Sequence, residues 1–243
     1  MASPKPTVAI FGATGGTGLA ALNLCLSAGH SVRVLARTPS KLSSLSAQYP
    51  NLSILQGDIH DIASIKETLL QDGKVVDVVI SAIGMTLQMK GLSFKSLDPH
   101  ICETGTRNII SALDSLPSPV NNPLLVLLST TGISSKSRDI PLAMIPMYHW
   151  VLPVPHADKK KMEELVIESG RRWVLVRPSF LVDGEAKGLD GVRVGVDVPA
   201  EEKEEKREVG YTIRREDVGL WIFEECIKGN KKDWEGKCVS LTS

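Results

Sequence analysis

The 243-residue chain lacks the features that mark membrane, secreted or nucleic-acid-binding proteins. No apolar run approaches the ~20 residues that a membrane-spanning helix needs, and the opening MASPKPTVAIF has no long apolar region of the kind found in signal peptides. Lys plus Arg and Asp plus Glu both number 28, so the formal net charge is zero and nothing indicates a nucleic-acid or anionic-membrane partner. We therefore expect a cytoplasmic protein with a small-molecule substrate, present as a monomer or a homodimer.

Cysteine is scarce and its spacing excludes the common metal motifs. The four cysteines lie far apart, with no CxxC or Cys/His pattern, so we expect reduced thiols and no metal site. Repeats and low-complexity tracts are also absent. The length suits one nucleotide-binding α/β domain over residues 1–243.

Apolar runs rich in Val and Ile alternate along the chain with helical patterns. The runs are nearly continuous, as strands buried on both faces require. The expected strands are Thr7–Phe11, Ser31–Ala36, Leu52–Gln56, Val75–Ile80, Leu124–Leu128, Trp173–Val176 and Cys238–Leu241. The expected helices are Thr17–Ala28, Ser40–Gln48, Ile62–Gln71, Leu97–Leu113, Asp158–Glu168 and Glu216–Ile227, with Gly29 as a helix stop and Asp61 and Asp217 as N-caps. This alternation predicts an α/β fold with a doubly wound parallel sheet, helices on both faces and ligands at the carboxyl ends of the strands.

The first strand and helix are joined by the glycine-rich segment GATGGTG. Gly12 would permit a tight turn, Gly15 would let the backbone approach a ligand, and Gly18 would let helix and strand pack closely. Free N–H groups at the start of the helix can hold a diphosphate. The predicted diphosphate site consists of Gly12, Thr14, Gly15, Gly16, Thr17 and Gly18. An ordinary strand–helix turn is the alternative.

The second apolar run ends in a cation, where an acidic residue would bind the ribose of NAD. Arg37 can pair with a 2′-phosphate, and Lys41, one helical turn later, adds a second positive charge. This favours NADP(H) over NAD(H), although both side chains could be ordinary surface charges. Arg33 is expected to be structural.

The third and fourth runs end in residues suited to an adenosine. Asp58 could accept a hydrogen bond from the adenine amino group with Ile59 against the ring, or it could cap the following helix. The next run is followed by small residues that would let the backbone lie against a ribose. This segment consists of Ser81, Ala82, Ile83 and Gly84.

Motifs along nearly the whole chain carry a family resemblance. They are GATGGTG at Gly12–Gly18, Arg37, GDIHD at Gly57–Asp61, SAIG at Ser81–Gly84, LLSTTG at Leu127–Gly132, DKKKMEELVIESGRRWVLVRPSFLVDG at Asp158–Gly184 and IRREDVGLWI at Ile213–Ile222. In these motifs the chain resembles the short-chain dehydrogenase/reductase superfamily, in its atypical, NmrA-like or NAD(P)H-binding branch. The resemblance implies a Rossmann-type fold that binds NADP(H), with a small C-terminal portion selecting the substrate.

Reductases of that superfamily commonly carry YxxxK on the helix after the fifth strand. The Tyr donates a proton to the substrate oxygen, while the Lys lowers the pKa of the Tyr and holds the nicotinamide ribose. The Lys corresponds to Lys159, or alternatively Lys160, but Pro155 and His156 stand where a Tyr would precede them. His156 or Tyr148, the latter from a loop, could supply the proton. Otherwise Lys159 acts alone, or catalysis is absent.

Hydroxyl residues follow the expected strand Leu124–Leu128, and a proline follows the expected strand Trp173–Val176. Ser129, Thr130 and Thr131 could act on the substrate or could cap a turn. Pro178 could place its carbonyl near the nicotinamide, and Arg177 is expected to pair with Asp217.

The three lysines at 159–161 have an alternative interpretation. They could form a solvated helix face, with Glu163 and Glu164 as partners.

Substrate-side segments are expected at about 84–96, 132–157 and 178–212. Two of them carry apolar residues outside the expected helices and strands: Met85, Leu87, Met89, Leu92, Met144, Ile145, Met147 and Trp150. Such residues suit an apolar substrate, and equally a dimer contact or a packed helix. Pro199–Glu208 is expected as an exposed loop or short helix.

These patterns favour one function and leave one alternative. The favoured function is an NADP(H)-dependent oxidoreductase that moves hydride between the nicotinamide and a small apolar carbonyl, enone or aromatic substrate. The alternative is a non-catalytic, NADP-binding redox sensor of the NmrA type that acts through a protein partner. The absent YxxxK tyrosine favours the sensor, whereas the lysine and the hydroxyl cluster favour the enzyme.

Overall fold

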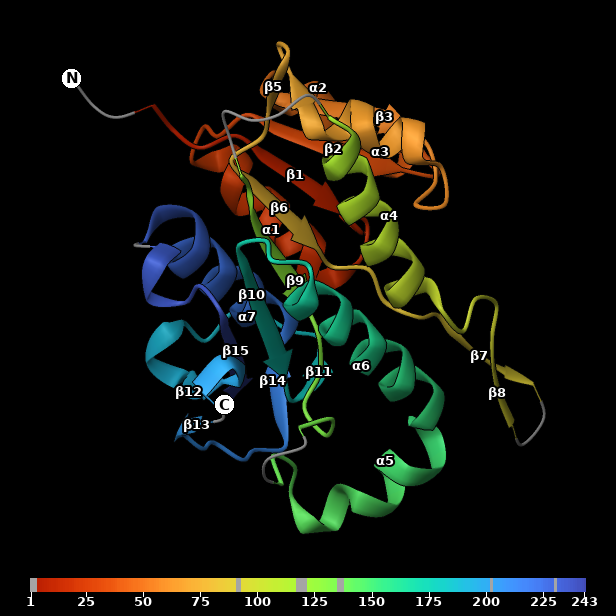
Figure 1. Cartoon of the computed structure of the whole chain (residues 1–243), viewed down its shortest axis with the longest axis vertical. Helices are drawn as coiled ribbons and strands as arrows, with labels where there is room; N and C mark the ends of the chain where they lie inside the picture. The colour runs from red at the N-terminus through yellow and green to blue at the C-terminus, as the bar shows by residue number, and fades with distance from the viewer. Residues whose placement is uncertain (1–3, 91–92, 117–121, 135–137, 202, 230) are drawn as a thin grey trace.

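The main sheet has a parallel centre and an antiparallel edge. The computed structural model describes residues 4–90, 93–116, 122–134, 138–201, 203–229 and 231–243. Within them, nine strands form one sheet in the order β13-β12-β15-β10-β9-β6-β1-β2-β3 (Figure 1). The parallel strands are β1 (Val8–Phe11), β2 (Val32–Ala36), β3 (Leu52–Gln56), β6 (Val78–Ser81), β9 (Leu124–Leu128), β10 (Trp173–Pro178) and β15 (Lys237–Thr242). The antiparallel edge strands are β12 (Arg193–Val198) and β13 (Lys203–Lys206).

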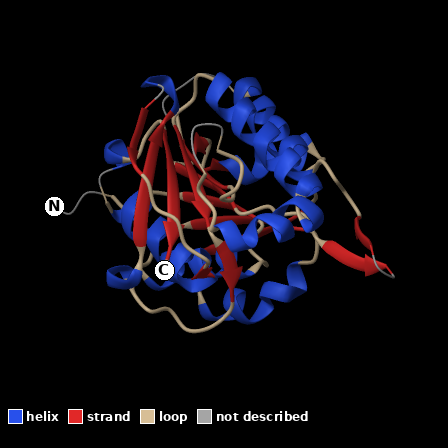
Figure 2. Cartoon of the chain, turned by 90° about the horizontal axis from the view of Figure 1, so that it is seen from below, coloured by secondary structure: helices blue, strands red, loops and turns tan. Residues whose placement is uncertain are grey.

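Helices cover both faces of this sheet (Figure 2). Successive side chains of β1 alternate between two buried clusters, with Val8 and Ile10 in one and Ala9 and Phe11 in the other. On the first face lie α1 (Gly16–Ser27), α7 (Arg215–Trp221) and the π-helix η5 (Ile222–Lys228). On the second lie α3 (Ile62–Leu69), α4 (Ile101–Ser115) and α6 (Pro153–Glu168). The Rossmann-type prediction is confirmed.

Smaller elements connect these layers. After β2 come the 3-10 turn η1 (Pro39–Leu42) and α2 (Ser43–Gln48), and β4 (Leu70–Gln71) pairs with β5 (Lys74–Val75). The remaining elements are β7 (Leu87–Lys90), β8 (Ser93–Ser96), η2 (Leu142–Met144), α5 (Ile145–Val151), β11 (Phe180–Val182), η3 (Leu189–Gly191), η4 (Pro199–Glu201), β14 (Thr212–Arg214) and η6 (Lys231–Asp233). Every helix in the described residues is too short or too polar to cross a bilayer.

The segments expected as loops contain regular structure. In the first, β7 and β8 form an antiparallel hairpin that projects from the body of the molecule (Figure 1). The second contains η2 and α5, and most of 199–208 is η4 and β13. Pairing with a neighbouring strand satisfies backbone groups in ways that local sequence patterns do not record. Leu92, together with the side chains of Leu87, Met89 and Met147, lies outside the described residues.

Three predicted helix boundaries have different outcomes. Asp61 caps α3, because its side chain accepts from the backbone N–H groups of Ala63 at 3.0 Å and Ser64 at 3.3 Å. Gly29 follows the end of α1 with φ +76°, which confirms it as a helix stop. Asp217 was wrong as an N-cap, since it lies inside α7, whose N-cap is Arg214.

Arg33 has the structural role expected of it. Its Nε and Nη2 donate to the carbonyls of Thr68 and Glu67 at 3.2 and 2.9 Å, at the end of α3. These bonds supply side-chain donors to carbonyl groups in the last turn of α3, where intrahelical donors run out.

Candidate functional site

The glycine turn between β1 and α1 is closely packed at its first and third glycines and open at the second. Gly12 has φ +84°, and a Cβ there would lie 2.7 Å from the backbone of Ala82. A Cβ on Gly18 would lie 2.3 Å from the Gly12 carbonyl oxygen. Gly15 is exposed, and a Cβ there would meet nothing closer than that oxygen, at 3.5 Å. The turn therefore presents accessible backbone at the start of α1.

The residues around Gly15 fit a diphosphate. Gly15 is the N-cap of α1 and makes no side-chain capping bond, so the first N–H groups of the helix are left for another acceptor. Thr17 is 4% exposed, and its Oγ1 has no hydrogen-bond partner within the described residues. Thr14 and Gly16 are exposed. A ligand with several acceptor oxygens would satisfy these groups.

A pocket of about 490 Å³ opens beside the start of α1. One of its lining residues is Arg215, to which the sequence analysis gave no role. Arg215, at the start of α7, crosses Gly16 so closely that a Cβ on Gly16 would lie 2.3 Å from the arginine Cδ. Its Nη1 lies 2.6 Å from Asp183 Oδ1. The lining residues are Gly16, Asp183, Gly184, Glu185, Ala186, Arg215 and Glu216.

The loop before this pocket is held by Asp217. Its Oδ1 accepts from the N–H groups of Lys187 at 2.7 Å and Gly188 at 3.0 Å. Asp217 is fully buried, so its carboxylate fixes the loop against α7 and does not pair with Arg177 as expected.

The predicted 2′-phosphate residues lie at the end of β2. Arg37 and Lys41 are both exposed, and neither forms an ion pair with another described residue. Arg37 directly follows β2, and Lys41 lies in η1.

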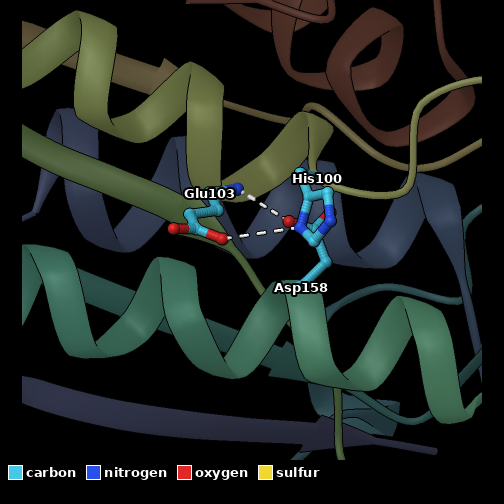
Figure 3. Close-up of side chains that lie close together, drawn as sticks. All are labelled: His100, Glu103 and Asp158. Atoms are coloured by element: carbon cyan, nitrogen blue, oxygen red, sulfur yellow. Dashed lines mark hydrogen bonds and ion pairs between the residues drawn. The ribbon is translucent and has the colours of Figure 1, made fainter.

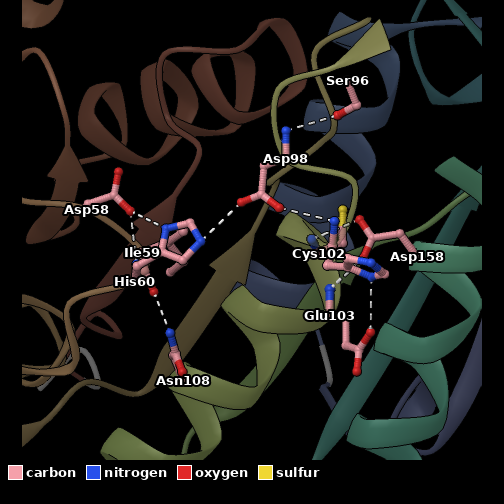
Figure 4. A network of polar contacts seen from close by, with 10 residues as sticks. Asp58, Ile59, His60, Ser96, Asp98, Cys102, Glu103, Asn108 and Asp158 are labelled. Carbon is pink, nitrogen blue, oxygen red and sulfur yellow. Dashed lines mark hydrogen bonds and ion pairs between the residues drawn. The ribbon is translucent and has the colours of Figure 1, made fainter. Parts of the chain in front are cut away.

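Asp58, at the end of β3, belongs to a polar network (Figure 4). Its Oδ1 accepts from the backbone N–H of His60 at 2.9 Å and lies 2.6 Å from His60 Nδ1. Burial alone would raise the pKa of Asp58, but the hydrogen bonds from His60 and the charges of His60 and Arg37 hold it below its usual value. The helix-cap alternative for Asp58 was wrong, because Asp61 caps α3.

Ile59 faces α4 instead of open space. It is 9% exposed, and a Cβ on Gly105 would lie 2.9 Å from its Cγ1. The Ile59 carbonyl accepts from Asn108 Nδ2 at 2.9 Å. These contacts fix the segment after β3 to α4.

The segment after β6 passes directly under the glycine turn. Ser81 is buried, and the Ala82 N–H donates to the Phe11 carbonyl at 2.9 Å. Gly84 is exposed, whereas the carbonyl of Ile83 is occupied by a side chain from α6. The strand ends of β1 and β6 therefore lie together, as the ribose prediction requires.

That side chain is Lys159. It is 9% exposed, and its Nζ donates to Ile83 O at 2.8 Å and to Leu128 O. The ammonium thus joins the ends of β6 and β9. The solvated-face alternative was wrong for Lys159 but holds for Lys160 and Lys161, which are exposed.

Asp158, beside Lys159, caps another helix. Its Oδ2 accepts from Cys102 N at 2.9 Å and its Oδ1 from Glu103 N at 2.8 Å, at the start of α4. His100 Nδ1 lies 3.6 Å from Glu103 Oε2, so three potential metal ligands are grouped (Figure 3). Because both Asp158 oxygens already accept backbone N–H groups, we assign this cluster to helix capping.

The two candidate proton donors lie against each other. Tyr148 is in helix α5 and buried, not on a loop as expected, with its hydroxyl 3.4 Å from Thr131 Oγ1. Burial raises the pKa of Tyr148. His156 lies within α6, which begins at Pro153 and not at Asp158, and its ring centroid is 5.1 Å from that of Tyr148.

Asp139 is a buried carboxyl group that sequence reasoning missed. It is 7% exposed, and its Oδ1 accepts from Gly132 N at 2.9 Å. Its Oδ2 has no hydrogen-bond partner within the described residues. Burial raises the pKa of Asp139. A Cβ on Gly132 would lie 2.6 Å from the Tyr148 ring, so Asp139 and Tyr148 contact the same glycine.

The hydroxyl residues after β9 differ in their surroundings. Ser129 is 4% exposed, and its Oγ has no hydrogen-bond partner among the described residues. Thr130 Oγ1 donates to the Thr131 carbonyl at 3.1 Å. The Pro178 carbonyl accepts from Thr131 N at 3.0 Å and from Thr131 Oγ1 at 3.3 Å, so it bonds to the segment that follows β9.

Arg177 forms a buried ion-pair group instead of reaching Asp217. Its Nη2 lies 2.6 Å from Glu163 Oε2, and its Nη1 lies 2.8 Å from Asp197 Oδ2. The Arg177 and Glu163 side chains are 8% and 6% exposed. The sequence suggested Glu163 only as a lysine partner in the solvated-face alternative and gave Asp197 no role, because α6 and β12 meet β10 only in the folded chain.

Residues 12–227 match the NAD(P)H-binding family. The chain belongs to this family. Among curated relatives, a protein named reductase pytE from Aspergillus terreus is 43% identical, with all of both chains covered. A protein named oxidase pynE from Aspergillus niger is 36% identical over 98% of this chain and 99% of the relative.

Solved structures agree with this NAD(P)H-binding family fold. A short-chain dehydrogenase/reductase from Veillonella parvula in complex with NADP has a TM-score of 0.75 at 12% identity, covering 99% of this chain and 95% of that one. The anaerobillin reductase ChuY from Escherichia coli O157:H7 has a TM-score of 0.67 at 17% identity, covering 97% and 96%. At these identities the likeness concerns the fold.

Proposed function

We propose that the protein is an NADP(H)-dependent oxidoreductase that acts on a small apolar carbonyl, enone or aromatic substrate. The observation that carries this proposal is the buried Lys159 ammonium, which lies between the carbonyls of Ile83 and Leu128 at the strand ends. Two relatives that match nearly the whole chain are named a reductase and an oxidase, which supports redox chemistry.

The cofactor would lie across the carboxyl ends of β1, β2, β3 and β6. Backbone N–H groups after Gly15 would hold the diphosphate, and the Thr17 hydroxyl would gain a partner. Arg37 and Lys41 would bind the 2′-phosphate. Asp58 has one oxygen engaged by His60, which leaves Oδ2 for the adenine amino group. When bound, the nicotinamide supplies or accepts the hydride.

The side chains around the strand ends would position the reactants and move the proton. Lys159 would donate its remaining N–H to a ribose hydroxyl while it fixes the two strand ends. Tyr148 would donate its hydroxyl proton to the substrate oxygen, with Thr131 orienting that hydroxyl and His156 against its ring. Ser129 and Thr130 would supply further hydroxyls to the substrate.

The test is NADPH oxidation with a panel of quinones, flavins and aldehydes by the wild type and Lys159→Met. Methionine keeps the length of the side chain and removes the charge, so we expect at least about a hundredfold loss of turnover, as for loss of a positioned charged group. Lys160→Met is the matched control, because this neighbouring lysine is exposed. Its turnover should equal that of the wild type.

Two results would overturn the proposal. One is turnover that survives Lys159→Met unchanged. The other is tight NADPH binding with no turnover on any acceptor and a protein partner that copurifies with the NADPH-bound form, which is the behaviour of a redox sensor.

A further inference from the structure

Both ring nitrogens of His60 face carboxylate oxygens (Figure 4). His60 Nδ1 lies 2.6 Å from Asp58 Oδ1, and His60 Nε2 lies 3.0 Å from Asp98 Oδ2. Asp58 follows β3, whereas Asp98 lies between β8 and α4. His60 therefore joins two segments that are far apart in the sequence.

This geometry favours a charged ring. A neutral imidazole has one N–H, so it can donate to only one of the two carboxylates, and its other nitrogen would face an oxygen lone pair. An imidazolium donates to both. In agreement, the hydrogen bond to Asp58 and the charges of Asp58 and Asp98 raise the pKa of His60, although its slight burial acts in the other direction.

Asp98 is itself fixed to the segment that leads into α4. Its Oδ1 accepts from His100 N at 3.1 Å, and its N–H donates to Ser96 Oγ at 3.1 Å. His60 therefore attaches the base of the β7–β8 hairpin and the start of α4 to the end of β3, where the adenine is proposed to bind.

The charges around His60 also bear on the cofactor. Asp58 and Asp61 come from its own segment, Asp98 from the segment before α4, and Arg37 from the end of β2. Loss of the His60 proton leaves a pair of carboxylates beside a polyanionic ligand. Deprotonation would therefore break one of the hydrogen bonds that join Asp58 to Asp98 through His60. It would also add repulsion between the two carboxylates and between them and the anionic cofactor.

We propose that His60 is a positioning residue of the cofactor site, whose imidazolium clamps Asp58 to Asp98 and thereby favours binding of the adenosine half. The proposal rests on the proposed cofactor function. As the pH rises through the His60 pKa, the clamp is lost and cofactor affinity falls, while the chemical step is unaffected.

The first test is calorimetric titration with NADPH and NADH between about pH 6 and about pH 9, across the titration of a histidine with a raised pKa. An exposed charge pair contributes up to about 1 kcal/mol, so the wild-type Kd should rise about threefold to fivefold with pH. His60→Gln should bind weakly at every pH with little pH dependence. His60→Arg, which stays charged, should keep its affinity at high pH. NADH serves as a reference because the 2′-phosphate of NADPH titrates at about pH 6.

The matched control is His100→Gln, since this exposed neighbour lies outside the clamp and should keep the wild-type pH profile. The kcat of His60→Gln at saturating cofactor should equal that of the wild type. The proposal is overturned if wild type and His60→Gln show the same dependence of Kd on pH.

A second measurement needs no cofactor. The His60 pKa, followed by NMR in the free protein, should fall in Asp98→Asn and stay unchanged in Glu164→Gln, a carboxylate on α6 that pairs with Lys161. An unchanged pKa in Asp98→Asn would overturn the clamp. Failure of every pyridine nucleotide to bind would instead overturn the proposed function, and the NMR titration would still decide the clamp.

Discussion

At the scale of single residues, substitution of Arg37 tests which of the two cofactors the protein prefers. It is exposed beside Asp58, so its loss should leave the fold intact. Arg37→Ala should weaken NADPH binding by about tenfold or more, because a charge-assisted hydrogen bond contributes about 1.5–3 kcal/mol, and should change NADH binding less than about twofold. Calorimetry measures both constants, with Lys74→Ala as a control for loss of an exposed cation. Equal losses for the two cofactors would contradict the 2′-phosphate prediction.

Residues whose role depends on backbone shape could be predicted from the sequence, and residues whose role depends on a distant partner could not. Gly12 and Gly18 were found because tight turns and close packing need glycine, and the structure has both. Lys159 was singled out by its spacing within a motif, and the structure buries its ammonium between two strand ends. His60 was missed because its partner Asp98 comes from another segment, and Asp139 because its burial and its bond to the Gly132 N–H depend on how the 132–157 segment folds.

At the scale of elements, α6, β10 and β12 are tied by one buried ion-pair group. Glu163→Gln would leave Arg177 with Asp197 as its main partner, and removing one member of a buried pair costs about 3–5 kcal/mol. We expect the free energy of unfolding to fall by about 3 kcal/mol in urea titrations. Glu164→Gln, which removes a surface pair with Lys161, should cost less than about 1 kcal/mol. Similar losses in the two variants would show that burial does not strengthen this group.

The strands in the centre of the sheet were predictable, because a strand that is buried on both faces needs a nearly continuous run of apolar residues. The six inner parallel strands are mostly buried and follow that rule, whereas β3, at the edge of the sheet, has Ser53 and Gln56 exposed. The edge strands β12 and β13 do not, because they pair through backbone groups and their sequences, RVGVDV and KEEK, are not continuous apolar runs. Helix α5 was missed because its apolar residues suggested a loop over the substrate.

At the scale of the whole molecule, the proposed cofactor contacts come from several strand ends, so binding should stabilise the entire fold. NADPH at 100 times its Kd should raise the free energy of unfolding by about 2.7 kcal/mol. For a chain of this length the melting temperature should rise by about 5–10 °C. Scanning fluorimetry with and without NADPH measures this shift.

Gly18→Ala tests whether the rise in melting temperature with NADPH depends on the glycine turn. Its new Cβ would lie 2.3 Å from the Gly12 carbonyl oxygen, so the turn must move and the thermal shift should be lost. Gly191→Ala is the control, because its Cβ would meet nothing closer than 3.7 Å. A full shift in Gly18→Ala would show that the cofactor does not depend on this turn.

The overall topology was predictable because strand–helix alternation permits few arrangements. The positions of the segments at 84–96, 132–157 and 178–212 were not, because their contacts with the sheet are set by tertiary packing. Tyr148 and His156 meet only because α5 and the early start of α6 bring them together.

The charged outer strand has a consequence for behaviour at high concentration. Every residue of β13, Lys203 to Lys206, is charged in the sequence, and this strand ends the sheet. The unpaired N–H and C=O groups of an outer strand can pair with a strand of a second chain, and charged residues on that strand oppose this pairing. The chain should therefore resist ordered aggregation through this border even when crowded.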